Sequence, residues 1–135
     1  MKNKTPVVFL VDDQKIINFV HRKVITVSGA ICTIFNYEDP KRALSDLKKK
    51  VPEFILLDIH MPEINGWQFL ERLKKENLKS KVIILSSSTS PFDIEKAKTY
   101  KSVIEYAVKP LTLTSFKYLF KKYCKKCWHN KKDIA

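Results

Sequence analysis

The chain has 135 residues, of which 44% are hydrophobic, and this size and composition are typical of one globular domain with a buried core. Its formal net charge is +12, from 26 Lys and Arg against 14 Asp and Glu. Such a balance permits binding to nucleic acid or to an anionic membrane but specifies neither. Solvated helix faces and a basic tail account for most of the excess.

The cysteines and the N-terminus indicate a reducing compartment. Cys32, Cys124 and Cys127 form an odd set, and the apolar run after the N-terminal lysines spans only Val7–Val11. That run is too short for a signal peptide or for a membrane-spanning helix. We therefore expect a cytoplasmic protein with free thiols and no membrane insertion.

The first predicted element is a buried strand at Val7–Val11, which ends in Asp12 and Asp13. A helix of about four turns follows, because apolar residues recur at helical spacing: Ile17, Val20, Val24 and Val27. Gly29 is suited to end that helix. A second strand, nearer the sheet edge, is expected at residues 30–35.

The middle of the chain continues the alternation. Asp39 can cap a second helix that has Pro40 at its first position. The strand Phe54–Leu57 is wholly apolar and runs directly into Asp58. Pro62 and the Asn-Gly pair at 65–66 then indicate a loop before the third helix.

The last third of the chain predicts two more strands, Val82–Leu85 and Val103–Val108. A short helix is expected after Pro91. The final helix carries apolar residues on one face, with Cys127 on the same side: Phe116, Leu119, Phe120 and Tyr123. We assign residues 5–127 to one domain and residues 128–135 to a short basic tail.

Five strands that alternate with five helices predict a doubly wound α/β fold. Such a fold has a parallel sheet covered by helices on both faces, with right-handed crossovers. The two glycines of the chain form neither a dinucleotide-binding fingerprint nor a phosphate-binding loop. A nucleotide-binding domain is therefore disfavoured.

Polar side chains stand directly after four of the predicted strands: Asp12, Asp13, Asp58, Ser86 and Lys109. We expect them to converge, because the carboxyl ends of parallel strands meet at one edge of the sheet. Three carboxylates repel one another, and Mg²⁺ is a natural counterion beside Lys109. Such a site is suited to phosphoryl transfer, in which a carboxylate can also be the nucleophile.

Four segments, VFLVDD, LLDIHMPEING, VIILSS and YAVKP, resemble in order and spacing the signatures of the response-regulator receiver domain, typified by CheY. The resemblance covers about residues 5–125 and implies a flavodoxin-like sheet of order 2-1-3-4-5. It implies Asp58 as the phosphoacceptor and Asp13 as a direct Mg²⁺ ligand. Asp12 would act largely through water, and the backbone carbonyl of His60 would be a further ligand.

The same resemblance implies that Ser86 and Lys109 bind the phosphoryl oxygens. Ser86 and Tyr106 correspond to the switch residues of the family, and Pro110 to a proline that follows a cis peptide bond. Two variable positions, which in the family tune the rate of phosphoryl loss, are occupied by His60 and Ser88.

Other metal and histidine sites are weaker hypotheses. Cys124 and Cys127, with His129 nearby, could supply three of the usual four ligands of a zinc site. No fourth ligand follows, so free thiols are favoured. His21 is expected at the solvated surface of the first helix because Arg22 and Lys23 follow it. A phosphodonor role is disfavoured because nothing around His21 resembles a histidine phosphotransfer motif. Trp128 is expected to be a packing residue.

The leading hypothesis is a stand-alone receiver, because fewer than ten residues follow the predicted last helix. It would accept a phosphoryl group on Asp58 from a sensor histidine kinase or histidine phosphotransfer protein. It would signal by conformational change to a protein partner. Two alternatives are open here: a partner with an acidic surface, and a phosphorylation-linked homodimer. Apart from its own phosphorylation and dephosphorylation, no enzymatic activity is expected. The alternatives are a phosphorylation-independent scaffold and a basic nucleic-acid-binding module, although DNA is the less favoured partner.

Overall fold

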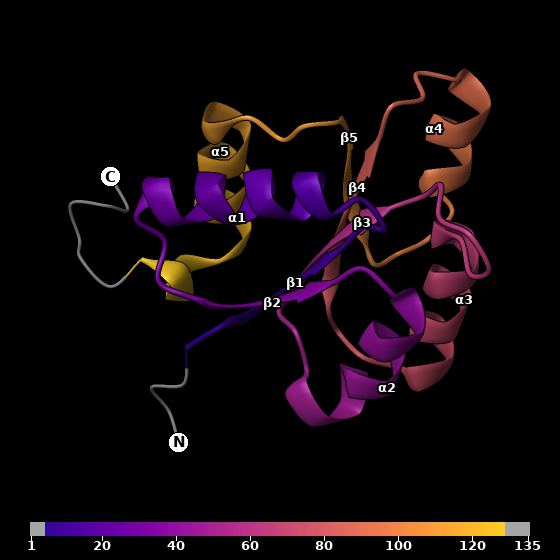
Figure 1. The fold of residues 1–135 in the computed structure, drawn as a ribbon, viewed down its shortest axis with the longest axis horizontal. Helices are drawn as coiled ribbons and strands as arrows, with labels where there is room; N and C mark the ends of the chain where they lie inside the picture. Colours follow the sequence, from indigo (N-terminus) through magenta and orange to yellow (C-terminus); the bar gives the residue numbers. More distant parts are fainter. Residues whose placement is uncertain (1–4, 129–135) are drawn as a thin grey trace.

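The computed structural model describes residues 5–128 and contains a parallel sheet between two layers of helices (Figure 1). The strands are β1 Val7–Val11, β2 Thr33–Tyr37, β3 Phe54–Asp58, β4 Lys81–Ser86 and β5 Val103–Val108. The helices are α1 Lys15–Ser28, α2 Pro40–Lys50, α3 Gly66–Glu76, α4 Pro91–Ala97 and α5 Leu113–Tyr123, followed by a short 3-10 helix, η1 Lys125–Cys127.

The strand order is β2-β1-β3-β4-β5, and every neighbouring pair is parallel. Helices α1 and α5 cover one face of the sheet, and α2, α3 and α4 cover the other (Figure 1). The predicted doubly wound fold is therefore confirmed. No helix among residues 5–128 has the length and apolar character needed to cross a membrane.

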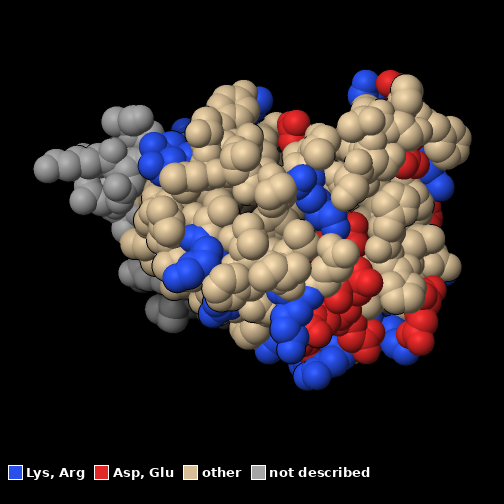
Figure 2. All heavy atoms as spheres, turned by 45° about the horizontal axis from the view of Figure 1, so that its top comes forward, with Lys and Arg blue, Asp and Glu red and all other residues tan. Residues whose placement is uncertain are grey.

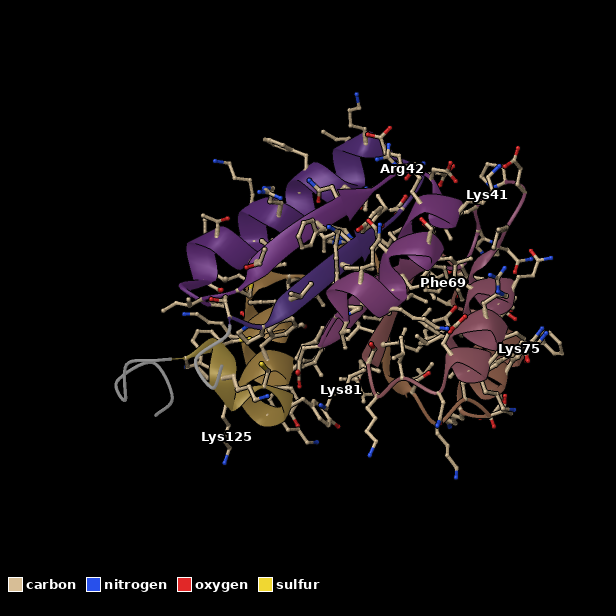
Figure 3. All side chains as sticks on the ribbon, turned by 90° about the horizontal axis from the view of Figure 1, so that it is seen from below. Lys41, Arg42, Phe69, Lys75, Lys81 and Lys125 are labelled. Carbon is tan, nitrogen blue, oxygen red and sulfur yellow. The ribbon has the colours of Figure 1, made fainter. Side chains whose placement is uncertain are left out.

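The central strand β3 is buried along its whole length, which explains why its sequence is a continuous apolar run. On the α5 side of the sheet, the ring of Phe120 stacks on that of Phe54, with 4.3 Å between the ring centroids, and its centroid lies 4.0 Å from that of Phe116. On the other side, Phe69 from α3 is fully buried against the sheet (Figure 3). Each buried aromatic ring contributes roughly 2–3 kcal/mol to folding.

The start of α3 is closely fitted to the end of β3. Asn65 and Gln68 form a reciprocal capping box, in which each side chain accepts a hydrogen bond from the other residue's backbone N–H. The Gly66 N–H donates to the Ile59 carbonyl at 2.8 Å. A Cβ at Gly66 would lie 2.7 Å from the Ile59 Cα, so only glycine fits here without displacing the chain beside Asp58.

The structure corrects two element boundaries. β2 begins at Thr33 rather than at residue 30, because the Ile31 N–H donates to the Cys127 carbonyl at 2.7 Å instead of pairing with β1. The last helix ends at Tyr123, and Cys127 lies in η1 rather than on its face. Trp128 is 3% exposed and packs in the core on the α5 side, as predicted for a packing residue.

The buried face of α1 differs from its most apolar face. Its buried row consists of Asn18, His21, Ile25 and Ser28. The apolar residues whose spacing predicts the helix lie next to that row, and Val27 among them is 68% exposed. Asn18 and His21 can occupy the buried row because the Asn18 amide nitrogen and Nε2 of His21 find backbone partners, which are described below.

Candidate functional site

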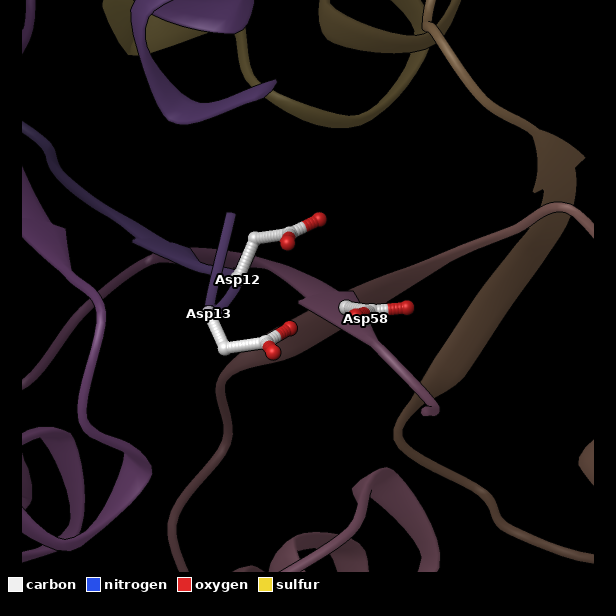
Figure 4. A group of neighbouring side chains, drawn as sticks. All are labelled: Asp12, Asp13 and Asp58. Atoms are coloured by element: carbon white, nitrogen blue, oxygen red, sulfur yellow. The ribbon is translucent and has the colours of Figure 1, made fainter. Parts of the chain in front are cut away.

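Three carboxylates meet at the C-terminal edge of the sheet, as predicted. Asp12 and Asp13 follow β1, Asp58 ends β3, and one oxygen of each lies within 4.8 Å of the others. Figure 4 shows the three side chains extending from the strand ends toward the same space. Asp12 and Asp58 are each 3% exposed, whereas Asp13 is open to solvent.

Lys109 enters this cluster from the loop after β5. Its Nζ atom lies 3.1 Å from Oδ2 of Asp12 and 3.4 Å from Oδ1 of Asp58. The peptide bond between Lys109 and Pro110 is cis, as the resemblance implies. Among residues 5–128, Lys109 alone forms ion pairs with the two buried carboxylates, so one positive charge faces three negative charges.

The pKa values reflect this imbalance. Burial, together with the neighbouring Asp12 carboxylate, raises the pKa of Asp58 from 3.8 to about 6, against the opposing effects of Lys109 and the His60 N–H. Burial also raises the pKa of Asp12, against the hydrogen bond from Gln14. Both carboxylates are therefore less stable as anions than they would be in water.

This donor set fits a hard divalent cation. Carboxylate oxygens grouped so closely, with fewer protein ligands than a full coordination shell, suit Mg²⁺, which retains several waters. The His60 N–H donates to Oδ1 of Asp58 at 3.3 Å, while the His60 side chain is exposed at the rim of the site. His60 is thus placed beside the carboxylates by its backbone, not by its imidazole.

The two predicted switch residues meet at Ser88, in the loop between β4 and α4. The fully buried Ser86 hydroxyl accepts a hydrogen bond from the Ser88 N–H at 2.9 Å. The Tyr106 hydroxyl donates to the Ser88 carbonyl, also at 2.9 Å. In turn the Ser88 hydroxyl donates to Asp93, in the first turn of α4, and accepts from the Ser90 N–H. The sequence indicates Ser88 only as a variable position, so its linking role is new.

Residues 8–123 match the response regulator receiver domain. The chain belongs to this family. Its members act in two-component signalling and bind Mg²⁺ through acidic residues, and the carboxylate cluster of this receiver agrees with that property.

Similar proteins include much longer ones. This receiver is 36% identical over 80 residues to a protein-glutamate methylesterase/protein-glutamine glutaminase of Treponema denticola, a match that covers 59% of the receiver and 22% of the relative. It is 29% identical over 107 residues to the DNA-binding transcriptional regulator NtrC of Salmonella typhimurium, covering 79% of the receiver and 22% of the relative. The receiver therefore spans 22% of the length of both curated relatives.

Solved structures support the same fold. A two-component response regulator from Cytophaga hutchinsonii superimposes with a TM-score of 0.80 at 32% identity, covering 89% of the receiver and 97% of that chain. The chemotaxis protein CheY4 of Vibrio cholerae gives a TM-score of 0.76 at 20% identity, covering 89% and 99%. The second likeness shows the fold alone.

The prediction that His21 lies at the solvated surface is wrong. The His21 imidazole is 2% exposed rather than solvated, and its Nε2 atom accepts a hydrogen bond from the Leu111 N–H at 3.0 Å. One turn earlier, Asn18 donates to the carbonyls of Asp12 at 3.0 Å and Tyr37 at 3.1 Å. The charged neighbours of His21 suggest a surface position, whereas the loop that needs an acceptor lies 90 residues later in the chain.

The cysteine pair lies far from the carboxylates in the fold, at the end of α5. Cys124 and Cys127 are free and buried, and their Sγ atoms are 2.7 Å apart. Among the described residues, the carboxylate cluster is the only group of three or more acidic, His or Cys side chains close enough to hold a metal ion. His129, the third residue of the zinc hypothesis, lies outside the described residues.

Proposed function

We propose that this receiver accepts a phosphoryl group on Asp58 from the phosphohistidine of a sensor kinase or histidine phosphotransfer protein. The observation that carries the proposal is the Asp58 carboxylate itself, held between the Lys109 ammonium and two further carboxylates. Asp12, Asp13, Asp58 and the His60 carbonyl would hold Mg²⁺. Bound there, Mg²⁺ would neutralise charge on the phosphoryl oxygens.

The chemistry of the transfer follows from this arrangement. An Asp58 oxygen attacks the phosphorus, a P–O bond forms, and the P–N bond to the donor imidazole breaks, with the imidazole nitrogen leaving with the bonding electrons. The Lys109 ammonium would stabilise charge on the phosphoryl oxygens as they approach. Because the pKa of Asp58 is about 6 without metal, the nucleophile is ionised at neutral pH.

The switch would work through Ser88. A phosphoryl group presents acceptor oxygens, and the Ser86 hydroxyl can donate to one only by turning toward Asp58 and weakening its contact with the Ser88 N–H. Ser88 is also bonded to Tyr106 on β5 and Asp93 on α4, so its movement reaches both elements. The phosphoryl group would thus shift the population of a two-state loop.

The signal would be read on the surface between α4 and β5. A hollow of about 260 Å³ lies there, lined by Ile94, Ala97, Lys98, Val103, Ile104, Glu105 and Tyr106. Of the lysines on this side, Lys98 pairs with Glu95 at 3.1 Å and Lys96 covers the ring of Trp67. Lys117 and Lys121 on α5 add positive charge, which favours an acidic partner and association that weakens with salt.

Exposed apolar residues on α1 would receive the phosphodonor. Ile16 is 64% exposed and Phe19 is 55% exposed, on the helix that begins two residues after Asp13. A shallow groove beside them is lined by Phe19, Val20, Lys23, Val24, Val27 and Leu113. Apolar patches rimmed by charge are typical of protein–protein contacts, and a donor bound here would lie next to the Asp58 site.

The charge distribution disfavours the nucleic-acid-binding alternative. On the face of the molecule that Figure 2 shows, Lys and Arg stand in separate groups with acidic residues between them. In Figure 3, Lys75, Lys81 and Lys125 extend from three different elements. Several lysines are paired with carboxylates, such as Lys41 with Glu63 at 2.8 Å. A nucleic-acid surface would need one continuous basic stripe. We propose a cytoplasmic signalling protein without enzymatic activity beyond its own phosphorylation and dephosphorylation.

Labelling with acetyl phosphate and Mg²⁺ tests the proposal. Wild type should gain one phosphate, Asp58→Asn none, and Asp39→Asn one. Asp39→Asn is the matched control because it makes the same change at an exposed helix cap, which asparagine preserves. Full labelling of Asp58→Asn would place the phosphoacceptor elsewhere. Absence of labelling combined with tight duplex DNA binding would support the nucleic-acid alternative.

Amide NMR spectra with and without beryllofluoride test the switch. We expect shifts at Asp58 that extend through Ser87 to Tyr106. Shifts confined to the neighbours of Asp58 would contradict the mechanism and leave a phosphate acceptor without a conformational readout.

A further inference from the structure

We infer that His21 is a positioning residue for Lys109, because its imidazole fixes the backbone segment from which the ammonium reaches Asp12 and Asp58. This inference rests on the proposed phosphoacceptor function. Its basis is the hydrogen bond of 3.0 Å from the Leu111 N–H to Nε2 of His21, between two residues that are each 2% exposed.

The segment from Lys109 to Leu111 is anchored at both ends. The Lys109 N–H donates to the Ser86 carbonyl on β4 at 3.0 Å, and the Leu111 N–H donates to His21 on α1. Pro110 between them has no N–H to donate. Without His21, the buried Leu111 N–H would lose its acceptor, and such a group is stable only if the chain shifts to find another or admits water.

A shift of the segment from Lys109 to Leu111 would change the position of the Lys109 ammonium relative to the carboxylates. The Lys109 ammonium stands 3.1 Å from Asp12 and 3.4 Å from Asp58, contacts that a displacement of the backbone by a fraction of an ångström would change. The side chain is only 10% exposed, so it has little freedom to compensate. His21 therefore acts on the phosphoryl group through Lys109 and not by touching it.

The imidazole is suited to this role in its neutral form. Because Nε2 accepts a hydrogen bond, the ring proton is on Nδ1. Burial and the nearby charge of Lys109 lower the pKa of His21 to about 4, which keeps the ring neutral at physiological pH. An apolar residue could fill the same space, but it could not accept the hydrogen bond.

The neighbouring turn of α1 supports a positioning role over simple packing. Asn18 holds the carbonyl of Asp12, on the carboxylate side of the site, while His21 holds Leu111, on the lysine side. Two of the three polar residues of the buried row, Asn18 and His21, thus bind the two loops that bring opposite charges together. Ile25, on the same row, packs in the apolar core and serves as an internal control.

Three variants separate positioning from packing. His21→Leu removes the acceptor at similar size, His21→Gln retains an oxygen near the Nε2 position, and Ile25→Val reduces packing on the same row. The measurements are the initial rate of labelling by acetyl phosphate with Mg²⁺, thermal stability, and the amide exchange rate of Leu111. We expect His21→Leu to label about tenfold more slowly, since small misplacements of a catalytic group have effects of this order or larger.

His21→Gln should recover a rate close to wild type and slow exchange at Leu111, whereas Ile25→Val should lose stability without losing rate. The inference is overturned if folded His21→Leu labels as fast as wild type, or if His21→Gln is as slow as His21→Leu. Failure of wild type to label would instead refute the proposed function, so the two failures are distinct.

Discussion

Removing the charge of Asp58 should stabilise the metal-free protein. Its folded-state pKa of about 6 lies above its ordinary value of 3.8, so ionisation is harder in the folded state than in the unfolded state. At about 1.36 kcal/mol per pH unit, this difference corresponds to about 3 kcal/mol of folding free energy lost once the carboxylate is ionised. Asp58→Asn should recover only part of this free energy, about 1–2 kcal/mol, because the substitution also removes one of the two ion-pair partners of Lys109.

The direction of the pH dependence follows from the sign of that shift. For an acid with a raised folded-state pKa, stability is lost as pH rises from the unfolded-state value toward about 6 and is constant above it. The gain in Asp58→Asn should therefore be small near pH 4 and complete at neutral pH. In terms of melting temperature, the gain should be about 3–8 °C.

Urea unfolding in EDTA, at acidic and neutral pH, measures this gain. Asp39→Asn is again the control, because it removes an exposed carboxylate that has no part in the cluster. Adding Mg²⁺ should stabilise wild type more than Asp58→Asn and so narrow the difference. The reasoning is refuted if Asp58→Asn is less stable than wild type in EDTA at neutral pH, or if its gain is the same near pH 4.

Three further outcomes are expected. Asp13→Ala should abolish the rise in melting temperature that Mg²⁺ produces, because a ligand stabilises only the state that binds it; a rise that survives would place the metal elsewhere. Cys124 and Cys127 should react as thiols on unfolding, and metal analysis of protein purified without added zinc should find no stoichiometric zinc. Gly66→Ala should lower stability by about 1–3 kcal/mol, because its Cβ would lie 2.7 Å from the Ile59 Cα; unchanged denaturant midpoints would show that the chain adjusts freely.

The order of elements and the convergence of site residues are predictable from sequence because both depend on local patterns. Val7–Val11 and Phe54–Leu57 are apolar since the inner strands are covered on both faces, and polar residues follow where a strand leaves the core. Parallel pairing then brings Asp12, Asp58 and Lys109 together without further information.

Features set by distant partners are not predictable in this way. The buried row of α1 contains Asn18 and His21 only because loops elsewhere in the chain offer backbone groups to them. β2 starts late because Ile31 bonds to Cys127, nearly a hundred residues away in sequence. Ser88 has a linking role because β5 brings Tyr106 to its carbonyl. In each case local periodicity favours a simpler arrangement, and a tertiary hydrogen bond decides against it.

The close fit of Gly66 against Ile59 makes the two sides of the proposed phosphorylation site unequal in rigidity. The chain after Asp58 is clamped by a backbone hydrogen bond, a capping box and a contact too tight for a methyl group. By contrast, Ser88 links the chain after Ser86 to Ser86, Tyr106 and Asp93 by side-chain hydrogen bonds. The segment after Asp58 is thus the fixed side of the site, and the segment after Ser86 is the side that can move. Under the proposed function, substitutions on the surface of the segment after Ser86 would alter the choice of partner, while the segment after Asp58 would keep the geometry of the phosphoacceptor.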